Sequence, residues 1–248
     1  MIPKILARGP FLPKNIKIIN ESSSQRKTNP EIEQLIYQTW EKMETKAIAQ
    51  NQMLWNGESL RLDDLKLENG ELTLFTSPTD YKTRASLELN ISKVENLSLQ
   101  YLSAGLAIGG FIETIDNYYI FNQRSHKSVD GNRVDFIGGV MDNMSAKDGF
   151  DLLEHNYLEI KEEINVSKNE IESINILGLI LGDSGNVIFI TSTKLNISFD
   201  YLQKLFEQKH DEEVFELVKV KDQDLEIFIN QIGRYKPLAL DLLKNHPQ

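Results

Sequence analysis

The stretch GGVMDNMSAKDGFDLLEHNYLEIKEEINV, residues 138–166, decides the fold of the region around it. Leu153, Tyr157, Ile160 and Ile164 follow one another at spacings of four, three and four. This period is typical of a helix with one apolar face. It predicts a helix over residues 146–164 that packs through these four side chains.

The same helix carries a trio of acidic residues, Glu159, Glu162 and Glu163. At spacings of three and four, the side chains are expected to project from one side, opposite the apolar stripe. Like charges held together repel and raise carboxylate pKa values, and a divalent cation removes both penalties. Carboxylates and carbonyl oxygens suit Mg²⁺ or Mn²⁺. The trio also fits a solvated face, and its spacing alone leaves both interpretations open.

Two glycines precede the acidic helix. The segment RVDFIGG, residues 133–139, reads as an apolar strand that ends in Gly138 and Gly139. Glycines at this point let the backbone bend sharply and bring a carbonyl close to a bound ion. The order of strand, Gly-Gly, loop and glutamate helix therefore favours the metal interpretation.

This order of elements resembles the Nudix box, whose pattern is G-x5-E-x7-R-E-U-x-E-E-x-G-U with U an aliphatic residue. EIKEE at residues 159–163 matches E-U-x-E-E, and Val166 matches the last aliphatic position. Leu158 stands in the place of the arginine and Asn165 in that of the final glycine, and the loop after the Gly-Gly pair is longer than in the box. The early glutamate of the box has no clear counterpart, and its candidates are Asp148, Asp151 and Glu154.

The departures are similar to those of one branch of the superfamily, the UDP-glucose and UDP-galactose diphosphatases that carry an N-terminal extension. Members of this branch tend to lack the box arginine and to have Asn in place of the last glycine. The resemblance extends upstream to about residue 35, and downstream to about residue 220. It includes WNG at 55–57, TDYK at 79–82, GLAIGG at 105–110 and YYIFNQRS at 118–125.

The resemblance implies a metal centre. Glu159 and Glu163 would coordinate Mg²⁺ together with the Gly139 carbonyl, and Glu162 would add a ligand or orient water. The metal would polarise a diphosphate and generate the attacking hydroxide. His155 lies one turn before Glu159 and could touch this site, although a solvated or supporting histidine is the plainer interpretation.

Other residues are expected to complete the site. Glu213, or its neighbour at 212, resembles the further carboxylate that many Nudix enzymes use as a base or extra ligand. Arg124 and Arg133 flank the loop before the Gly-Gly strand and could bind a phosphate. Tyr81 and Lys82 could reach a nucleotide or sugar from the N-terminal part. A surface or packing role is the alternative for all four of these substrate-binding candidates.

The surrounding elements mix helices and strands. Asn29 can cap a helix that starts at Pro30, and Asn69-Gly70 marks a turn between antiparallel strands. A hairpin is predicted across residues 182–186, followed by a helix, a strand at EVFELVKV and two final helices. No regular βαβ alternation appears, so we expect an α/β (α+β) chain. Its Nudix-type α/β/α sandwich with a mixed sheet would span residues 101–248, and a smaller α+β extension, residues 1–100, would pack on it.

The composition of the chain excludes several kinds of site and partner. The chain has 248 residues, 40% of them apolar and 26% charged, as in ordinary globular proteins. It has no cysteine, which excludes disulfides, zinc-thiolate sites and thiol nucleophiles. Its net charge of -10 disfavours nucleic acids and anionic membranes as partners. Because no apolar run suits a membrane span or signal peptide, a cytoplasmic location is expected.

The function expected from these observations is that of a Mg²⁺- or Mn²⁺-dependent Nudix-type diphosphatase, a pyrophosphohydrolase. Its substrate would be a small nucleoside diphosphate derivative, with hydrolysis of UDP-glucose or UDP-galactose to UMP and a sugar 1-phosphate as the first choice. ADP-ribose or another nucleoside diphosphate derivative is an alternative substrate. Leu158 motivates a different class, a catalytically weak nucleotide-binding module, and an interaction domain that inherited the fold is a third. A homodimer is possible.

Overall fold

The large sheet of the protein is mixed. In the computed structural model its strand order is β1-β9-β10-β5-β6-β11, with β7 beside β6 and β8 beside β5. The β10–β5 pair is parallel and the other pairs are antiparallel. The structure describes residues 1–21, 24–51, 53–124, 133–142, 151–208 and 214–246. The strands are β1 (Lys4–Phe11), β5 (Leu106–Glu113), β6 (Tyr118–Arg124), β7 (Val134–Asp135), β8 (Ile137–Val140), β9 (Ile171–Leu181), β10 (Val187–Leu195) and β11 (Val214–Lys221).

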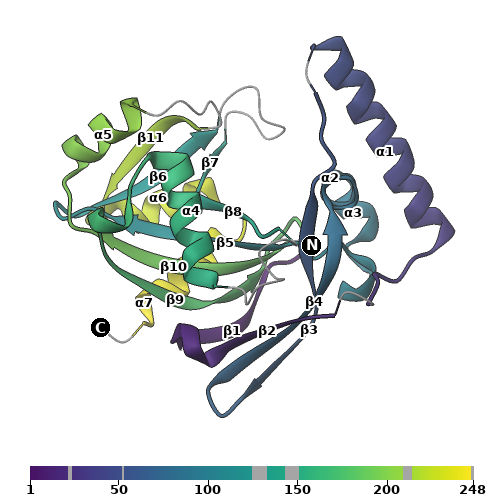
Figure 1. Ribbon diagram of the computed structural model, residues 1–248, viewed down its shortest axis with the longest axis horizontal. Coiled ribbons are helices and arrows are strands. Elements are labelled where there is room, and N and C mark those ends of the chain that lie inside the picture. The colour runs from purple at the N-terminus through teal and green to yellow at the C-terminus, as the bar shows by residue number, and fades with distance from the viewer. Residues whose placement is uncertain (22–23, 52, 125–132, 143–150, 209–213, 247–248) are drawn as a thin grey trace.

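Helices cover both faces of this sheet (Figure 1). Alternate residues of a strand point to opposite faces, and β5 shows this. Phe111 packs in a cluster with α6 and α7, whereas Ile112 packs in another with α4 and α5. The predicted fold class, a mixed sheet between helical layers, is therefore confirmed. The helices of these layers are α4 (Leu152–Ile164), α5 (Phe199–Glu207), α6 (Leu225–Ile232) and α7 (Lys236–Lys244).

A smaller α+β unit precedes the large sheet. Its three strands run in the order β2-β4-β3, and the Asn69-Gly70 turn joins β3 to β4 with both residues at positive φ, as predicted. The Asn29 side chain accepts a hydrogen bond from the Ile32 amide at 2.8 Å, which confirms the predicted cap. The elements are β2 (Ile16–Asn20), α1 (Pro30–Ala49), β3 (Glu58–Glu68), β4 (Glu71–Asp80), α2 (Tyr81–Leu89) and α3 (Ile91–Val94). Short 3-10 helices are Pro13–Asn15, Leu99–Tyr101, Lys168–Glu170 and Asp222–Asp224.

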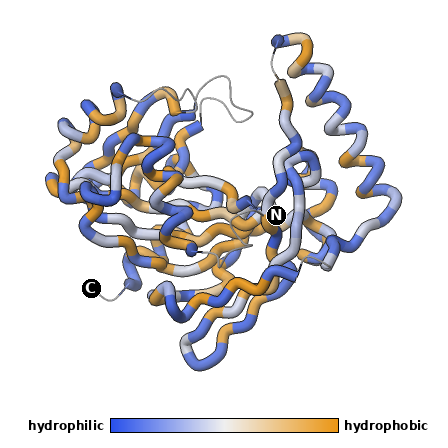
Figure 2. Tube along the Cα trace, in the orientation of Figure 1, coloured by the Kyte–Doolittle hydropathy of each residue, from blue (hydrophilic) through white to orange (hydrophobic). Residues whose placement is uncertain are grey.

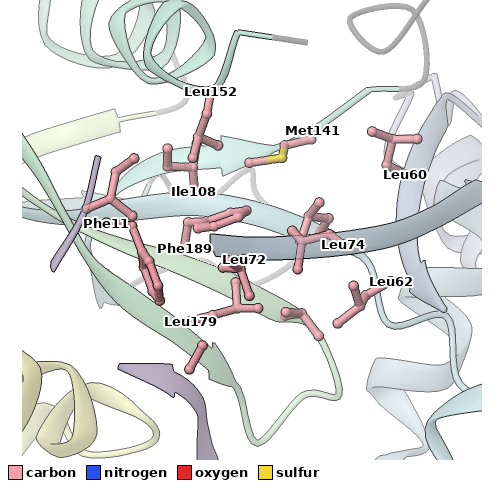
Figure 3. Close-up of a cluster of buried hydrophobic side chains, with 14 of the residues drawn as sticks. Phe11, Leu60, Leu62, Leu72, Leu74, Ile108, Met141, Leu152, Leu179 and Phe189 are labelled. Carbon is pink, nitrogen blue, oxygen red and sulfur yellow. The ribbon is translucent and has the colours of Figure 1, made fainter. Parts of the chain in front are cut away.

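The two sheets share one apolar core. Figure 3 shows side chains of β3 and β4, among them Leu62 and Leu74, in the same cluster as Ile108 and Phe189 of the large sheet. A backbone hydrogen bond also connects β3 to the residues just before β5, because the Leu62 amide donates to the Ala104 carbonyl at 3.0 Å. Figure 2 shows apolar residues concentrated in the strands and polar residues at the tip of the β3–β4 hairpin. The N-terminal unit is thus packed against the large sheet.

The N-terminal strands depart from the sequence-based prediction. No element was assigned before residue 29, where β1 pairs with β9 in the large sheet and β2 pairs with β4. The expected division at residue 100 therefore does not follow the sheets, because β1 belongs to the large one. Among the described residues no helix is long and apolar enough to cross a membrane.

Candidate metal and phosphate site

Both ends of α4 are defined by side chains that the sequence places there. Asp151 caps the start and accepts hydrogen bonds from the Leu153 and Glu154 amides at 2.9 and 3.2 Å. Asn165 ends the helix with φ 57° and ψ 28°. Asn tolerates this left-handed conformation better than most residues, which suits it to a position where the resembled pattern has glycine. Its side chain also donates to the Leu205 carbonyl at 2.8 Å.

The candidates for the early box glutamate have structural roles where they can be seen. Asp151 is occupied as the helix cap, and Glu154 forms an ion pair with Lys168. Asp148 lies outside the described residues. The described residues therefore give the early glutamate no counterpart at the site.

Glu163 is buried, with 4% of its surface exposed. Its Oε2 accepts hydrogen bonds from the Asn122 side chain at 2.9 Å and from the Gly138 amide at 3.1 Å. Glu162 is exposed. Glu162 and Glu163 therefore differ in burial although they are neighbours, because successive helical residues point about 100° apart. Glu163 thus joins α4 to both β6 and the Gly-Gly segment.

Glu159 meets the same segment from one helical turn away. A Cβ built on Gly139 would lie 2.3 Å from Glu159 Oε2 and 2.4 Å from Oε1. The carboxylate therefore lies directly against the Cα of Gly139, where any side chain would displace it. The structure brings together Glu159, Glu163 and Gly139, the three groups predicted as metal ligands.

His155 is a close neighbour of Glu159. Its Nε2 lies 3.3 Å from Glu159 Oε1, and 9% of its surface is exposed. Burial lowers the pKa of His155, while the charge of Asp142 acts in the opposite direction. The sequence indicated this position only through its spacing from Glu159. The imidazole therefore lies beside the Glu159 carboxylate, where it can support it.

The donor set suits a hard cation. Two carboxylates and a backbone carbonyl are oxygen ligands of the kind that Mg²⁺ and Mn²⁺ take, and Mg²⁺ usually retains several waters. Within the described ranges, no three acidic or histidine side chains gather closely enough to hold a metal by themselves. Glu213, the other expected carboxylate, lies outside these ranges. Glu159, Glu163 and Gly139 therefore fit a partly hydrated cation.

A pocket rich in arginine adjoins the glycines. Gly138 and Gly139 form part of its wall. Two of the arginines, at 124 and 133, were expected from the sequence. The other two come from the turn before α7 and from α2 of the N-terminal unit, and only folding brings them here. The four arginines are Arg84, Arg124, Arg133 and Arg234.

Buried charges support this wall. Asp135 forms ion pairs with Arg133 and with Lys236, whose Nζ lies 2.9 Å away and which is fully buried. Burial acts to raise the pKa of Asp135, but Lys236 and Arg133 outweigh it, and the pKa lies below its ordinary value. Arg234 is held by Asp183 at 2.7 Å. Together with Lys236, the four arginines outnumber the carboxylates of Glu88, Asp135 and Asp183, and this excess of positive charge suits phosphate.

The two candidates from the N-terminal unit, Tyr81 and Lys82, lie in different places. Tyr81 lines a second pocket with Trp55, and Arg84 lines both pockets, so the two adjoin. The Arg84 guanidinium lies 5.1 Å from the centre of the Tyr81 ring, and Trp55 is 78% exposed. Lys82 instead lies over the Tyr37 ring at 5.7 Å and lines neither pocket. The structure brings Tyr81 to the site and does not bring Lys82.

Comparisons with known proteins give similarities of fold. No family model matches the chain, and no curated protein matches it. The NUDIX domain of Shewanella oneidensis NrtR, complexed with ADP ribose, is 14% identical over 62% of this chain and 96% of its own, with a TM-score of 0.41. A NUDIX hydrolase from Nitrosomonas europaea is 15% identical over 56% and 86%, with a TM-score of 0.38. The Bacillus subtilis pyrophosphohydrolase BsRppH is 12% identical over 77% and 96%, with a TM-score of 0.39.

Proposed function

We propose that this chain is a Nudix-type diphosphatase that uses Mg²⁺ or Mn²⁺ to hydrolyse a nucleoside diphosphate derivative. One observation carries the proposal: the Gly138–Gly139 segment contacts the Glu159 and Glu163 carboxylates and also forms a wall of the arginine-lined pocket. Groups that suit a cation and groups that suit a diphosphate therefore meet along one short segment of backbone.

Different residues would bind the diphosphate and the cation. Arg124 and Arg133 hold the diphosphate by charge-assisted hydrogen bonds, and Arg84 adds a donor from the N-terminal unit. Glu159, with the Gly139 carbonyl, would hold the cation. A divalent cation bound there supplies Lewis acidity and a water of lowered pKa. Glu163 keeps the Gly-Gly backbone in place through its bond to the Gly138 amide, and it would also help to hold the cation.

The nucleoside or sugar would occupy the adjoining pocket. Trp55 and Tyr81 offer aromatic faces there, and flat apolar groups stack on such faces. UDP-glucose and UDP-galactose are the first candidates, giving UMP and a sugar 1-phosphate, and ADP-ribose is the alternative. The roles of Glu162, Glu213 and Lys82, the homodimer and the cytoplasmic location stay predictions from the sequence.

A second candidate is a nucleotide-binding module with weak catalysis. It is favoured by the two hydrogen bonds that Glu163 Oε2 already accepts inside the fold, which limit its freedom as a metal ligand. Leu158, which replaces the box arginine, is 47% exposed. The two candidates share the same pocket and differ in whether bound nucleotide is cleaved.

Product analysis tests the proposal. UDP-glucose, UDP-galactose and ADP-ribose are incubated with the full chain and Mg²⁺, and ³¹P NMR identifies the products. We expect cleavage of the diphosphate linkage of one class of substrate. Arg124→Gln should raise KM by about tenfold, as for a lost charge-assisted hydrogen bond, whereas Arg8→Gln, at an exposed position on β1, should match the parent. Saturable nucleotide binding without any cleavage would instead establish the binding module.

A further inference from the structure

A second groove lies at the opposite end of the sheet face that α6 and α7 cover. It encloses about 860 Å³ between the ends of β5, β6, β9 and β10 and the last helix. Along these strands the residues on this face change from apolar to polar, from Phe111 to Glu113 in β5 and from Ile190 to Lys194 in β10. Ile108 of β5 lines the arginine pocket, whereas Glu113 lines the groove. The two residues are five positions apart, or about 16 Å along the strand. The groove is therefore separate from the arginine pocket.

Negative charge dominates the groove. Lys244 is neutralised by Glu226 at 2.7 Å, and Lys194 lies opposite Glu113 in the β10–β5 pair. Burial raises the pKa of Glu113, Asp222 and Glu172 add to the effect, and Lys194 opposes it. Two lysines therefore face four carboxylates. These are Glu113, Glu172, Asp222 and Glu226.

A largely buried tyrosine opens into the same groove. Tyr119 lines it, has 8% of its surface exposed, and packs the edge of its ring against Phe111 with centroids 6.0 Å apart. Its hydroxyl makes no hydrogen bond with any residue that the structure describes. Burial, and then the charges of Glu113 and Asp222, raise its pKa well above the ordinary value. The phenol faces the groove without a partner among the described residues, so it is available to hydrogen-bond a ligand there.

The arrangement of the carboxylates selects the class of ligand. In the described part of the chain, no three acidic or histidine side chains stand close enough to share one metal ion. The negative charges are instead spread along a groove whose other walls include Leu225, Leu240 and Leu243. A linear aliphatic polyamine has the matching pattern, because its ammonium groups are separated by short methylene chains.

We propose that this groove binds a linear aliphatic polyamine. One ammonium group lies between Glu113 and Asp222 and donates an N–H to the Tyr119 hydroxyl. The methylene segments lie on Leu240 and Leu243, where they lose contact with water. A further ammonium group pairs with Glu172. This inference is independent of the proposed diphosphatase activity and of its metal.

Isothermal titration of spermidine into the full chain, without nucleotide or added divalent cation, tests this site. We expect saturable binding that weakens about tenfold in Asp222→Asn and in Glu113→Gln, as for lost bonds to a charged group. Tyr119→Phe keeps the ring and should weaken binding by about threefold, as for a neutral partner. Glu71→Gln, an exposed control at the β3–β4 turn, and Glu159→Gln should bind as the parent does.

Circular dichroism of each variant shows that it is folded, and Asp222→Asn, at an exposed position, remains informative if Glu113→Gln is not. Absence of saturable binding to the parent would overturn the proposal. Equal weakening by Glu71→Gln would also overturn it, because the attraction would then be general. Competition by Mg²⁺ at the same concentration as spermidine would identify charge screening in place of a polyamine site.

Discussion

At the scale of single residues, the adjacent glycines Gly138 and Gly139 have different roles. Gly138 has φ +146°, and a Cβ there would lie 2.1 Å from the backbone oxygen of Ile108. A Cβ on Gly139 would meet the Glu159 carboxylate, the movable end of a side chain. Backbone cannot move aside cheaply, whereas a carboxylate can. The fold therefore requires the first glycine and the proposed site requires the second.

Alanine at each position should separate these roles. Gly138→Ala should lower the free energy of unfolding by about 1–3 kcal/mol or more, as for an overpacked interior, measured by urea denaturation. Gly139→Ala should remain folded and lose activity on the order of a hundredfold, because it moves the Glu159 carboxylate out of position. If Gly139→Ala had the same kinetics as the parent, the contact with Glu159 would have no role in catalysis.

The buried pair behind the arginine pocket predicts a pH-dependent stability. Asp135→Asn leaves Lys236 buried without its charge partner, which should cost about 3–5 kcal/mol. The pKa of Asp135 is lowered by folding, so its contribution is complete above the unfolded-state value of about 3.9. It is lost as the pH falls through the lower folded-state pKa. Urea denaturation should show a parent–variant difference that is constant near neutral pH and shrinks in acid.

A matched second variant controls that experiment. Lys236→Met in the Asp135→Asn background removes the stranded ammonium group, so it should recover much of the lost stability. A double variant as unstable as Asp135→Asn alone would mean that Asp135 stabilises the protein through Arg133 and not through Lys236.

At the scale of the element, α4 shows what a hydropathy pattern can predict. The helix and its end at residue 164 were predicted, but it begins at Leu152 and not at residue 146. Ile160 and Ile164 are buried, as expected. Leu153 and Tyr157 are only half-buried, while Asn156 and Glu163 are buried in their place. The apolar period cannot anticipate this, because Glu163 is buried on account of Asn122, a partner far away in the chain. The spacing of the acidic residues therefore indicated that a site lies on this helix, but not which of the acidic side chains is buried.

The end of α4 predicts a stability difference between two substitutions. Asn165→Ala should lower the free energy of unfolding by about 1–2 kcal/mol, because alanine resists the left-handed conformation and loses the bond to Leu205. Asn165→Gly should cost less, because glycine adopts this conformation freely. The measurement is chemical denaturation of both variants. If alanine were the milder change, the cap would not explain the Asn at this position.

At the scale of the whole molecule, the N-terminal unit is part of the core and of the site. The sequence suggested an extension that packs on the fold, but it did not reveal that β1 completes the large sheet. Pro3, Pro10 and charged residues interrupt the apolar pattern there, and the pairing partner β9 lies far along the chain. Arg84 likewise enters the pocket only through tertiary packing.

Removal of residues 1–100 should therefore leave a chain that does not fold. The deletion removes β1 and four leucines that are 0% exposed. Each buried leucine contributes about 1.5–3 kcal/mol, which together is comparable with the whole stability of a typical domain, about 5–15 kcal/mol. These leucines are Leu60, Leu62, Leu72 and Leu74. Near-UV circular dichroism and a thermal melt are the measurements, and a cooperative transition in the shortened chain would contradict the shared core.

In the proposed function, Glu159 holds a divalent cation beside the diphosphate. The most direct measurement is the rate of UDP-sugar and ADP-ribose hydrolysis as a function of Mg²⁺ concentration, for the parent, Glu159→Gln and the exposed control Glu216→Gln. We expect that hydrolysis requires Mg²⁺, and that Glu159→Gln lowers the rate on the order of a hundredfold and needs more Mg²⁺. Glu216→Gln should match the parent. Hydrolysis with the same Mg²⁺ dependence in Glu159→Gln as in the parent would contradict the claim.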